Sequence, residues 1–299
     1  MGRLGEGIVR KRGQLKRGQS PISFWRTRLG EKGTVPMAVV AALTVACGRV
    51  ETTGRAQVAP AQLTLGYGQS QPLRLTFQPL FELDKVHGTP TVFVHLLHPT
   101  EKLVRTFDHA LPAPWVPGQE QSYEIDLYQS VLAEALPAGS YRLSIGLYDD
   151  EYGYRWMLDT GGEELGRREY VVGGVEVPEH SHHPRFAFSG GWRPAEKMPN
   201  RQVLARRCLV APAALDVSDA PGDGSVRLLL SVPAPPSDGD TALRVGGDCG
   251  TEPQDLGAGR QWLDFPVAGE TVQKGCQILF QPAAEGERSC LEVLAWRQE

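Results

Sequence analysis

Short segments that alternate apolar with polar residues, or that are apolar throughout, recur along most of the chain. Turns rich in glycine and proline separate them, as is typical of β-strands. In the first part of the chain these segments are 73–77, 91–97, 123–127 and 141–148. In the second part they are 226–232, 242–245, 261–267, 276–281 and 290–296. The pattern predicts an all-β protein with two tandem antiparallel β-sandwiches.

One segment, 129–136, has the pattern of a helix of one or two turns, but it runs directly into Pro137. We interpret it as a connection between strands, because proline ends helices. The 34 glycines and 23 prolines of the chain interrupt helical patterns almost everywhere. The sequence Pro-Ala-Gly-Ser-Tyr at 137–141 predicts a tight turn that leads into a strand, with Tyr141 packed at the corner of the sandwich.

The least polar segment is MAVVAALTVACG, residues 37–48, and it follows a basic stretch. A helix needs roughly 20 apolar residues to cross a bilayer, so this segment is too short for an ordinary membrane span. Its length and its basic flank are typical of a signal peptide. The ending Leu-Thr-Val-Ala-Cys resembles the bacterial lipoprotein box, which implies cleavage after residue 46 and a lipid on Cys47. The alternatives are another secretory signal, or a buried strand or short core helix in which Cys47 is an ordinary thiol.

Charge changes the picture when this leader is set aside. Residues 1–46 contain nine of the 31 basic residues and two of the 35 acidic ones, which leaves the rest of the chain with a formal charge of about −11. An acidic surface repels phosphate backbones, so nucleic acid is not an expected partner. We expect the membrane to be a partner, through the lipid on Cys47.

Two stretches of the first part carry a resemblance to a known family. They are FVHLLHPTEKLVRTFDHALPAPWVPGQ at 93–119 and YEIDLYQSVLAEALPAGSYRLSIGLYDDEYGYRW at 123–156. Over about residues 58–177 the chain resembles an immunoglobulin-like β-sandwich module of bacterial envelope proteins, notably the extracytoplasmic part of mannosyltransferase-like membrane glycosyltransferases. Those enzymes do their chemistry in a polytopic membrane domain, which this sequence lacks. The resemblance therefore implies a fold and not an activity.

The second part begins with FAFSGGWRPAE at 186–196, which resembles the opening of jelly-roll-like modules that often follow the first type in envelope proteins. The expected organisation is a leader at 1–46, a tether at 47–57, an Ig-like sandwich at 58–177, a His-rich linker at 178–185 and a jelly-roll-like sandwich at 186–299. Ligand-binding relatives of this shape hold sugars on exposed aromatic rings. The resemblance thus makes Trp192, Trp262 and Trp296 candidates for glycan contact, and each also has the simpler interpretation of a core residue.

Histidines are the candidate residues for metal binding or catalysis. His180, His182 and His183 lie close together in the linker, but adjacent side chains on a loop do not preorganise a metal site. The histidines of the first part are His87, His95, His98 and His109. Asp108 and His109 are the pair that could act as a catalytic dyad, although no nucleophile motif accompanies them. We expect no metal and no cofactor.

Four cysteines fall in the second part, and none falls in the first sandwich. An even number confined to one small domain predicts two disulfides in an oxidising compartment. Of the three possible connectivities we favour Cys208 with Cys290 and Cys249 with Cys276, because the first and last strands of a jelly roll tend to be neighbours. A zinc site is the alternative, but the spacing of a Cys-x-x-Cys motif is absent.

These observations predict a noncatalytic, lipid-anchored protein of the bacterial cell envelope. It would bind a glycan or a protein partner, or act as an accessory or assembly subunit. The alternative is an envelope hydrolase or metal-dependent enzyme, which would require the first-part histidines to converge with carboxylates in one pocket. A structural spacer without any binding groove is the third possibility.

Overall fold

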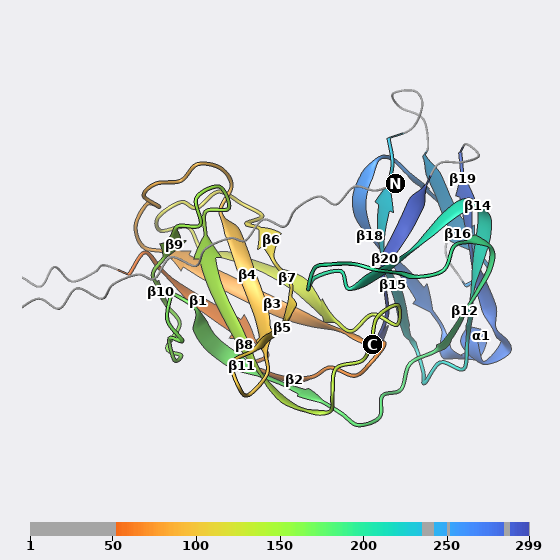
Figure 1. The fold of residues 1–299 in the computed structure, drawn as a ribbon, viewed down its shortest axis with the longest axis horizontal. Coiled ribbons are helices and arrows are strands. Elements are labelled where there is room, and N and C mark those ends of the chain that lie inside the picture. Colours follow the sequence, from red (N-terminus) through yellow and green to blue (C-terminus); the bar gives the residue numbers. More distant parts are fainter. Residues whose placement is uncertain (1–51, 235–241, 250–251, 284–287, 299) are drawn as a thin grey trace, which may run out of the picture. The chain divides into compact units, whose positions relative to one another are not determined.

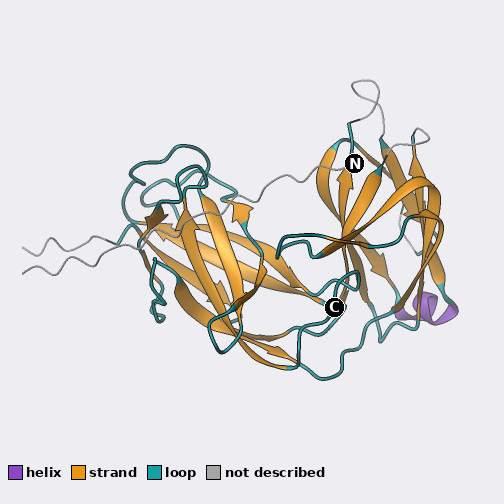
Figure 2. Cartoon of the chain, in the orientation of Figure 1, coloured by secondary structure: helices purple, strands orange, loops and turns teal. Residues whose placement is uncertain are grey.

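The computed structural model describes residues 52–234, 242–249, 252–283 and 288–298. The predicted leader, 1–46, and the lipidation candidate Cys47 lie outside these described residues. All described residues belong to one compact unit of the chain, Val50–Glu299. Strands dominate this unit (Figure 2), and the all-β fold predicted from the sequence is confirmed. In the described part, no helix combines the length and apolarity that a membrane crossing needs.

The first part of this unit is a sandwich of two sheets, which we call the first sandwich (Figure 1). One sheet has the order β10-β1-β3-β7 and contains β1 (Gly54–Ala59), β3 (Ser70–Pro79), β7 (Gln121–Tyr128) and β10 (Leu158–Asp159). The other has the order β2-β11-β8-β4-β5 and contains β2 (Gln62–Thr64), β4 (Thr91–Leu97), β5 (Leu103–Thr106), β8 (Gly139–Tyr148) and β11 (Tyr170–Val177). The short strands β6 (His109–Ala110) and β9 (Arg155–Trp156) pair with β4 and β8.

Alternation of apolar residues along the strands fills the space between these two sheets. On β3, Leu73, Leu75 and Phe77 are fully buried, and the residues between them face away from the core. On β4 both faces are covered, which explains why its sequence is apolar almost throughout. Tyr141 is buried at the start of β8 and donates its hydroxyl to the carbonyl of Pro137 (2.7 Å), a corner contact typical of Ig-like sandwiches.

The second part is a nine-stranded sheet with the order β17-β16-β19-β14-β20-β15-β18, to which β12 and β13 add by pairing with β14. Its strands are β12 (Arg185–Trp192), β13 (Glu196–Lys197), β14 (Ala205–Ser218), β15 (Gly224–Val232), β16 (Leu243–Gly247), β17 (Gln254–Leu256), β18 (Gly259–Val267), β19 (Cys276–Pro282) and β20 (Ser289–Gln298). The helix α1 (Gly269–Lys274) connects β18 to β19. A second core, which includes Phe265, Phe280 and Trp296, lies against this sheet.

Several of these elements were not predicted from the sequence. β12 and β14 carry no clean alternation, because β12 is half exposed along its length and β14 contains Pro212. The segment 129–136 forms a connection, as we interpreted it. The side-chain amide of Gln129 replaces helical hydrogen bonds there, because it donates to the carbonyl of Leu65 (2.7 Å) and accepts from the backbone N–H of Leu136 (2.8 Å).

Apolar contact joins the nine-stranded sheet to the first sandwich. Leu229 of β15 and Val293 and Ala295 of β20 belong to the hydrophobic cluster of the first sandwich. Backbone hydrogen bonds reinforce the contact: Trp296 donates to the carbonyl of Gly68 (2.7 Å), and Val131 donates to that of Leu294 (3.0 Å). This junction sets the outer faces of β15 and β18 beside β7.

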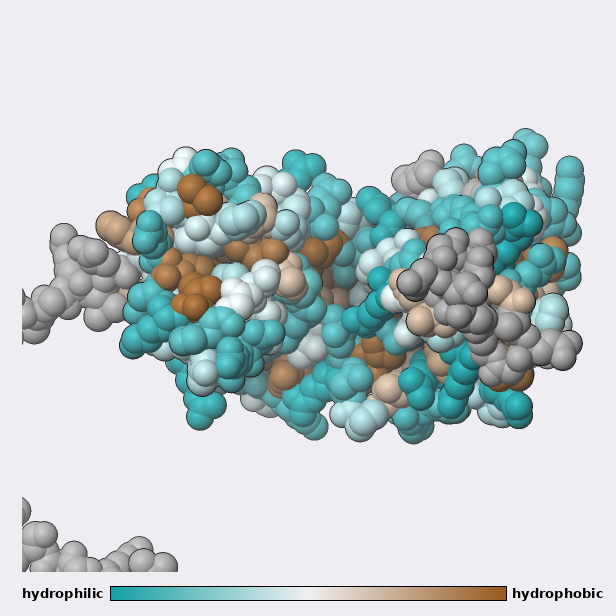
Figure 3. All heavy atoms as spheres, turned by 90° about the horizontal axis from the view of Figure 1, so that it is seen from above, coloured by the Kyte–Doolittle hydropathy of each residue, from teal (hydrophilic) through white to brown (hydrophobic). Residues whose placement is uncertain are grey.

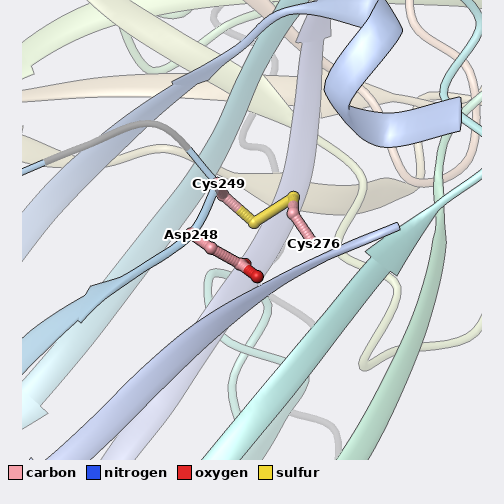
Figure 4. Close-up of side chains that lie close together, drawn as sticks. All are labelled: Asp248, Cys249 and Cys276. Atoms are coloured by element: carbon pink, nitrogen blue, oxygen red, sulfur yellow. A yellow bond between two sulfur atoms is a disulfide. The ribbon is translucent and has the colours of Figure 1, made fainter. Parts of the chain in front are cut away.

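The structure joins Cys208 to Cys290 and Cys249 to Cys276, the two pairs that the sequence analysis favoured. The first bond links neighbouring strands, since Cys208 of β14 lies opposite Cys290 of β20 in the sheet register. The second connects the end of β16 to the start of β19, and Figure 4 shows it with Asp248 alongside.

The sulfur atoms of Cys249 and Cys276 and the Asp248 carboxylate lie within 4.8 Å of one another. Sulfur in a disulfide is no thiolate ligand, so this cluster holds no metal while the bond is intact.

Reducing the two bonds is expected to destabilise the nine-stranded sheet. The bonds close loops of 82 and 27 residues, and the loss of chain entropy in the unfolded state corresponds to about 4 kcal/mol for each. Calorimetry of the double variants Cys208→Ala/Cys290→Ala and Cys249→Ala/Cys276→Ala should show a lower melting temperature for both, with the larger decrease for the longer loop. Non-reducing peptide mapping is the direct check, and four free thiols would contradict the pairing.

Candidate functional site: a hollow around Trp262

A hollow of about 520 Å³ lies at the junction between β7 and the strands β15 and β18. We call it the Trp262 hollow. It is lined by Phe107, Asp108, His109, Pro112, Tyr123, Glu124, Ile125, Asp126, Tyr128, Gln202, Arg227, Leu229, Arg260 and Trp262. Its wall contains both aromatic rings and charged groups, and this mixture is typical of sites that bind a polar organic ligand.

Strand geometry explains why the Trp262 ring faces the hollow. Along β18, Leu263, Phe265 and Val267 are buried, so the period of two directs Trp262 outward. Its exposed fraction is 39%, although its ring meets the ring of Tyr128 edge to face at 5.5 Å between centroids. The guanidinium of Arg227 lies 5.3 Å from the centre of the same ring, within range of a cation–π contact.

An ion network reaches the hollow through Asp126 and Arg227, which line it. The Asp126 carboxylate accepts hydrogen bonds from Arg227 and from Ser70 (3.2 Å), and Arg297 lies 3.7 Å from it. Arg227 also donates to Asp264 (2.6 Å). Burial raises the pKa of Asp126, and the two arginines oppose this effect. The network therefore holds Arg227 under the Trp262 ring by charges from both sides of the junction.

His109 lines the hollow, but both of its ring nitrogens are already engaged. Nδ1 lies 2.9 Å from the carbonyl oxygen of Phe107, and Nε2 lies 2.8 Å from the hydroxyl of Tyr123. Burial lowers the pKa of His109, which favours the neutral ring. Among the described residues His109 makes no side-chain hydrogen bond with Asp108. The two residues thus do not form the dyad that their adjacency in the sequence allowed.

A second polar cluster is buried next to β4. His95 has Nδ1 at 2.9 Å from the carboxylate of Glu169 and Nε2 at 3.6 Å from that of Asp108. Ser144 donates its hydroxyl to Glu169 (2.7 Å), and the Phe93 ring stacks on His95 at 4.6 Å between centroids.

This His95 cluster does not have the order of a catalytic triad. The serine hydroxyl bonds to the carboxylate and not to the imidazole, so His95 does not activate it as a base would. Burial raises the pKa of Asp108, with His95 opposing the effect. Burial would also raise the pKa of Glu169, but the hydrogen bonds from His95 and Ser144 outweigh it, and the net shift is downward. The hydrogen bonds of the cluster link β4 and β8 through Glu169, which directly precedes β11.

The remaining candidate histidines have local structural contacts. The His87 backbone N–H donates to Asp149 (2.7 Å), and the His98 ring bonds to Thr100 (2.9 Å). In the linker, His183 stacks on Phe186 with 6.2 Å between ring centroids, and the carbonyl of His182 accepts from Gln69 (2.9 Å). A hollow next to these contacts is lined by His183 and Phe186, and His180 is not among its lining residues.

The three candidate tryptophans occupy different environments. Trp296 is fully buried in the second core. Trp192 is half-buried, donates its ring N–H to the carbonyl of Ala214 (2.9 Å) and packs on Phe280. Trp262 presents its ring to a hollow, and it is the one of the three that a ligand can reach without a rearrangement of the core. The sequence analysis did not identify its neighbours Asp126, Tyr128 and Arg227, because no local pattern links them.

No family model matches this chain, and no curated protein is similar to it. Among solved structures, the chain is similar to TmCBM61 in complex with β-1,4-galactotriose, with 12% sequence identity and a TM-score of 0.24 over 38% of this chain and 88% of that chain. It is also similar to α-2-macroglobulin of E. coli, with 10% identity and a TM-score of 0.24. This match covers 84% of this chain and 14% of that chain. A Salmonella α-2-macroglobulin mutant gives 11% identity and the same TM-score. Similarity at this level carries no argument about function.

Asp126→Asn should lower the free energy of unfolding by about 3 kcal/mol, because it leaves Arg227 buried with less compensation. Denaturant titration measures the change. Asp264→Asn is the matched control: it removes a partner of the same arginine, but its carboxylate is 43% exposed, so a loss below about 1 kcal/mol is expected. Equal losses in the two variants would contradict a buried network.

Glu169→Gln should lower the stability in a pH-dependent manner. The pKa of Glu169 is below its ordinary value of 4.5 in the folded protein, so its stabilising effect is complete above that value and is lost as the pH falls through the lower folded pKa. The stability difference between wild type and variant should therefore be constant near neutral pH and shrink in acid. Urea titrations at several pH values test this, with the exposed Glu163→Gln as control. A difference that grows in acid would refute the assignment.

Proposed function

We propose that this protein is a noncatalytic, glycan-binding protein of the bacterial cell envelope, and that the Trp262 hollow is its binding site. The observation that carries the proposal is the exposed ring of Trp262 at the mouth of a hollow whose wall also carries fixed charges. A sugar ring has an apolar face of C–H groups and an edge of hydroxyls. The hollow offers a partner for each.

The aromatic wall would take the apolar face of the sugar. Tyr128 holds the Trp262 ring from one side and Arg227 holds it from below, so the ring is fixed before a ligand arrives. A fixed aromatic surface loses little conformational entropy on binding. Tyr128 is itself fixed, since it is buried and its hydroxyl donates to the carbonyl of Gln202 (3.2 Å).

The polar wall would take the hydroxyls. Arg260 is 41% exposed at the hollow and donates its ε N–H to Glu292 (2.7 Å). Glu124 lines the opposite side and accepts from Arg74 (2.9 Å). Charged donors and acceptors form stronger hydrogen bonds than neutral ones do, and their positions would select among sugar stereoisomers. The volume of the hollow lies in the usual range for small-ligand sites and suits a short oligosaccharide or the end of a longer one.

The polar groups of the hollow are already engaged in ion pairs and hydrogen bonds, which favours binding over catalysis. Asp126 is held by Arg227 and Arg297, and Asp108 accepts the backbone N–H of Val94 (3.3 Å). His109 is engaged at both ring nitrogens. A hydrolase needs a carboxyl or imidazole group with a free position towards the substrate. Groups engaged in this way orient a ligand better than they transfer its protons.

Location in the envelope is the second part of the proposal, with Cys47 as the lipid-carrying residue. The apolar segment that ends at Cys47 and its basic flank support it. The two cysteine pairs in bonding geometry also support it, because disulfides persist in oxidising compartments outside the cytoplasm. The protein would then display its hollow to glycans of the envelope.

Binding is tested with a glycan array followed by calorimetric titration of the best ligand. Trp262→Ala should weaken binding by about 30-fold, the equivalent of about 2 kcal/mol for a central aromatic contact, and Trp262→Phe should retain most of it. Tyr152→Ala is the control, because Tyr152 is 66% exposed and does not line the hollow. If no glycan binds, or if Trp262→Ala binds as well as wild type, the proposal fails.

Lipidation is tested by metabolic labelling with radioactive palmitate in a bacterial host. Label should enter the wild-type protein and not Cys47→Ser. The membrane association of the wild type should survive high salt, because burial of acyl chains at about 0.8 kcal/mol per methylene is not screened by ions. Equal release of both proteins by salt would refute the anchor.

A further inference from the structure

The loops at one end of the first sandwich expose an unusual number of apolar side chains. Four of the six large apolar residues that are exposed among the described residues lie here: Phe81 (49%), Val86 (39%), Val116 (37%) and Tyr152 (66%). We call these four residues and their loops the apolar loop end. Figure 3, which views the unit from above, shows hydrophobic residues gathered on the part that carries the first sandwich. Exposed apolar clusters of this kind mark interaction surfaces.

Contacts between the three loops that carry Phe81 and Val86, Val116, and Tyr152 show that they form one surface. The ring N–H of Trp115, next to Val116, donates to the carbonyl of Phe81 (2.9 Å). The His87 ring, next to Val86, meets the Tyr152 ring at 4.3 Å between centroids. Between these contacts lies a groove of about 660 Å³, whose wall includes Val86, Trp115 and Val116. The loops that carry the exposed residues are therefore joined to one another.

The described chain begins at this same end. The carbonyl of Thr53 accepts backbone hydrogen bonds from Leu80 (3.0 Å) and Phe81 (3.1 Å). Gly54 lies against Trp115, so closely that an added Cβ would approach the ring to 2.6 Å. Thr53 lies six positions after Cys47, and a chain segment of that length spans at most about 20 Å even when fully extended. A lipid on Cys47 would thus hold the apolar loop end within about 20 Å of the membrane surface.

We propose that the apolar loop end docks on the lipid surface beside the Cys47 anchor; this inference rests on the lipid anchor of the proposed function. Phe81, Val86, Val116 and Tyr152 enter the interfacial region of the bilayer, where aromatic residues are commonly found. The anchor keeps the loops at a high effective concentration near the bilayer, so a modest apolar area suffices.

The charges of the loops decide what kind of lipid surface is suitable. Beside the apolar residues lie Glu82, Asp84, Asp150 and Glu151, with Lys85 as the basic neighbour. This excess of acidic groups gives no attraction to anionic headgroups. Docking is therefore driven by apolar burial, it occurs on zwitterionic phosphatidylcholine, and it is insensitive to salt.

The test separates the loops from the anchor. The chain from Cys47 onward, which contains the whole compact unit Val50–Glu299, is coupled through the Cys47 thiol to a maleimide lipid in phosphatidylcholine vesicles. Brominated phosphatidylcholine then quenches tryptophan emission at acyl-chain depth, and Trp115→Phe identifies the share that belongs to Trp115. We expect quenching of Trp115 in the wild type, at low and at high salt.

The loop variant Phe81→Asp/Val116→Asp/Tyr152→Asp should lose this quenching, while Leu279→Asp, which changes a residue with 39% exposure on β19, should keep it. None of the three loop positions lines the Trp262 hollow, so retained glycan binding shows that the loop variant is folded. Wild-type emission that is equal on brominated and plain vesicles overturns the inference. Chemical coupling replaces cellular lipidation here, so a failure of palmitate labelling would not affect this result.

Discussion

Three apolar side chains of the nine-stranded sheet, Leu229, Val293 and Ala295, are buried in the core of the first sandwich. Backbone hydrogen bonds from Trp296 to Gly68 and from Val131 to Leu294 surround this contact. It places the outer face of β15 and β18 beside the edge strand β7, and each wall of the Trp262 hollow comes from one of these two sides. Without the apolar contact, the aromatic and charged groups of the site would remain on separate surfaces.

The buried charges of Asp126 and Arg227 affect how the two parts of the protein meet at this junction. Removing Asp126 and Arg227 from water is unfavourable, and their attraction compensates for it only in one geometry. The pair can therefore set the register in which the two parts meet more strictly than apolar packing can. Arg227 also lies beneath the Trp262 ring, so the same side chain that fixes the junction fixes the aromatic surface offered to a ligand.

The polar groups of the first sandwich show that a histidine close to a carboxylate is not by that fact alone arranged as a catalytic group. His95 bonds to Glu169 through Nδ1 and has Asp108 3.6 Å from its Nε2, whereas both ring nitrogens of His109 make hydrogen bonds within the fold. The buried hydroxyl of Ser144 donates to Glu169. Groups that are satisfied in this way hold strands together and shape surfaces. In the proposed function the protein recognises a ligand with such a fixed surface, and in the further inference its apolar loops dock on the lipid.

The sequence by itself determined the strands with strong period-two or continuous apolar patterns, such as β4 and β8, because alternation depends on local geometry alone. It also indicated the cysteine pairs, because the expected jelly roll places its first and last strands side by side, and in the structure Cys208 lies opposite Cys290 on neighbouring strands. It did not reveal β12 or β14, whose residues are selected by the neighbours on which they pack. The alternation of β18 already directs Trp262 outward with Arg260 and Asp264, but only the tertiary structure shows that this outward ring faces a hollow and that Trp296, in a strand apolar on both faces, is buried. The tertiary structure alone brought Asp126 and Arg227 together across 101 positions, because a contact between distant residues depends on packing that no local pattern records.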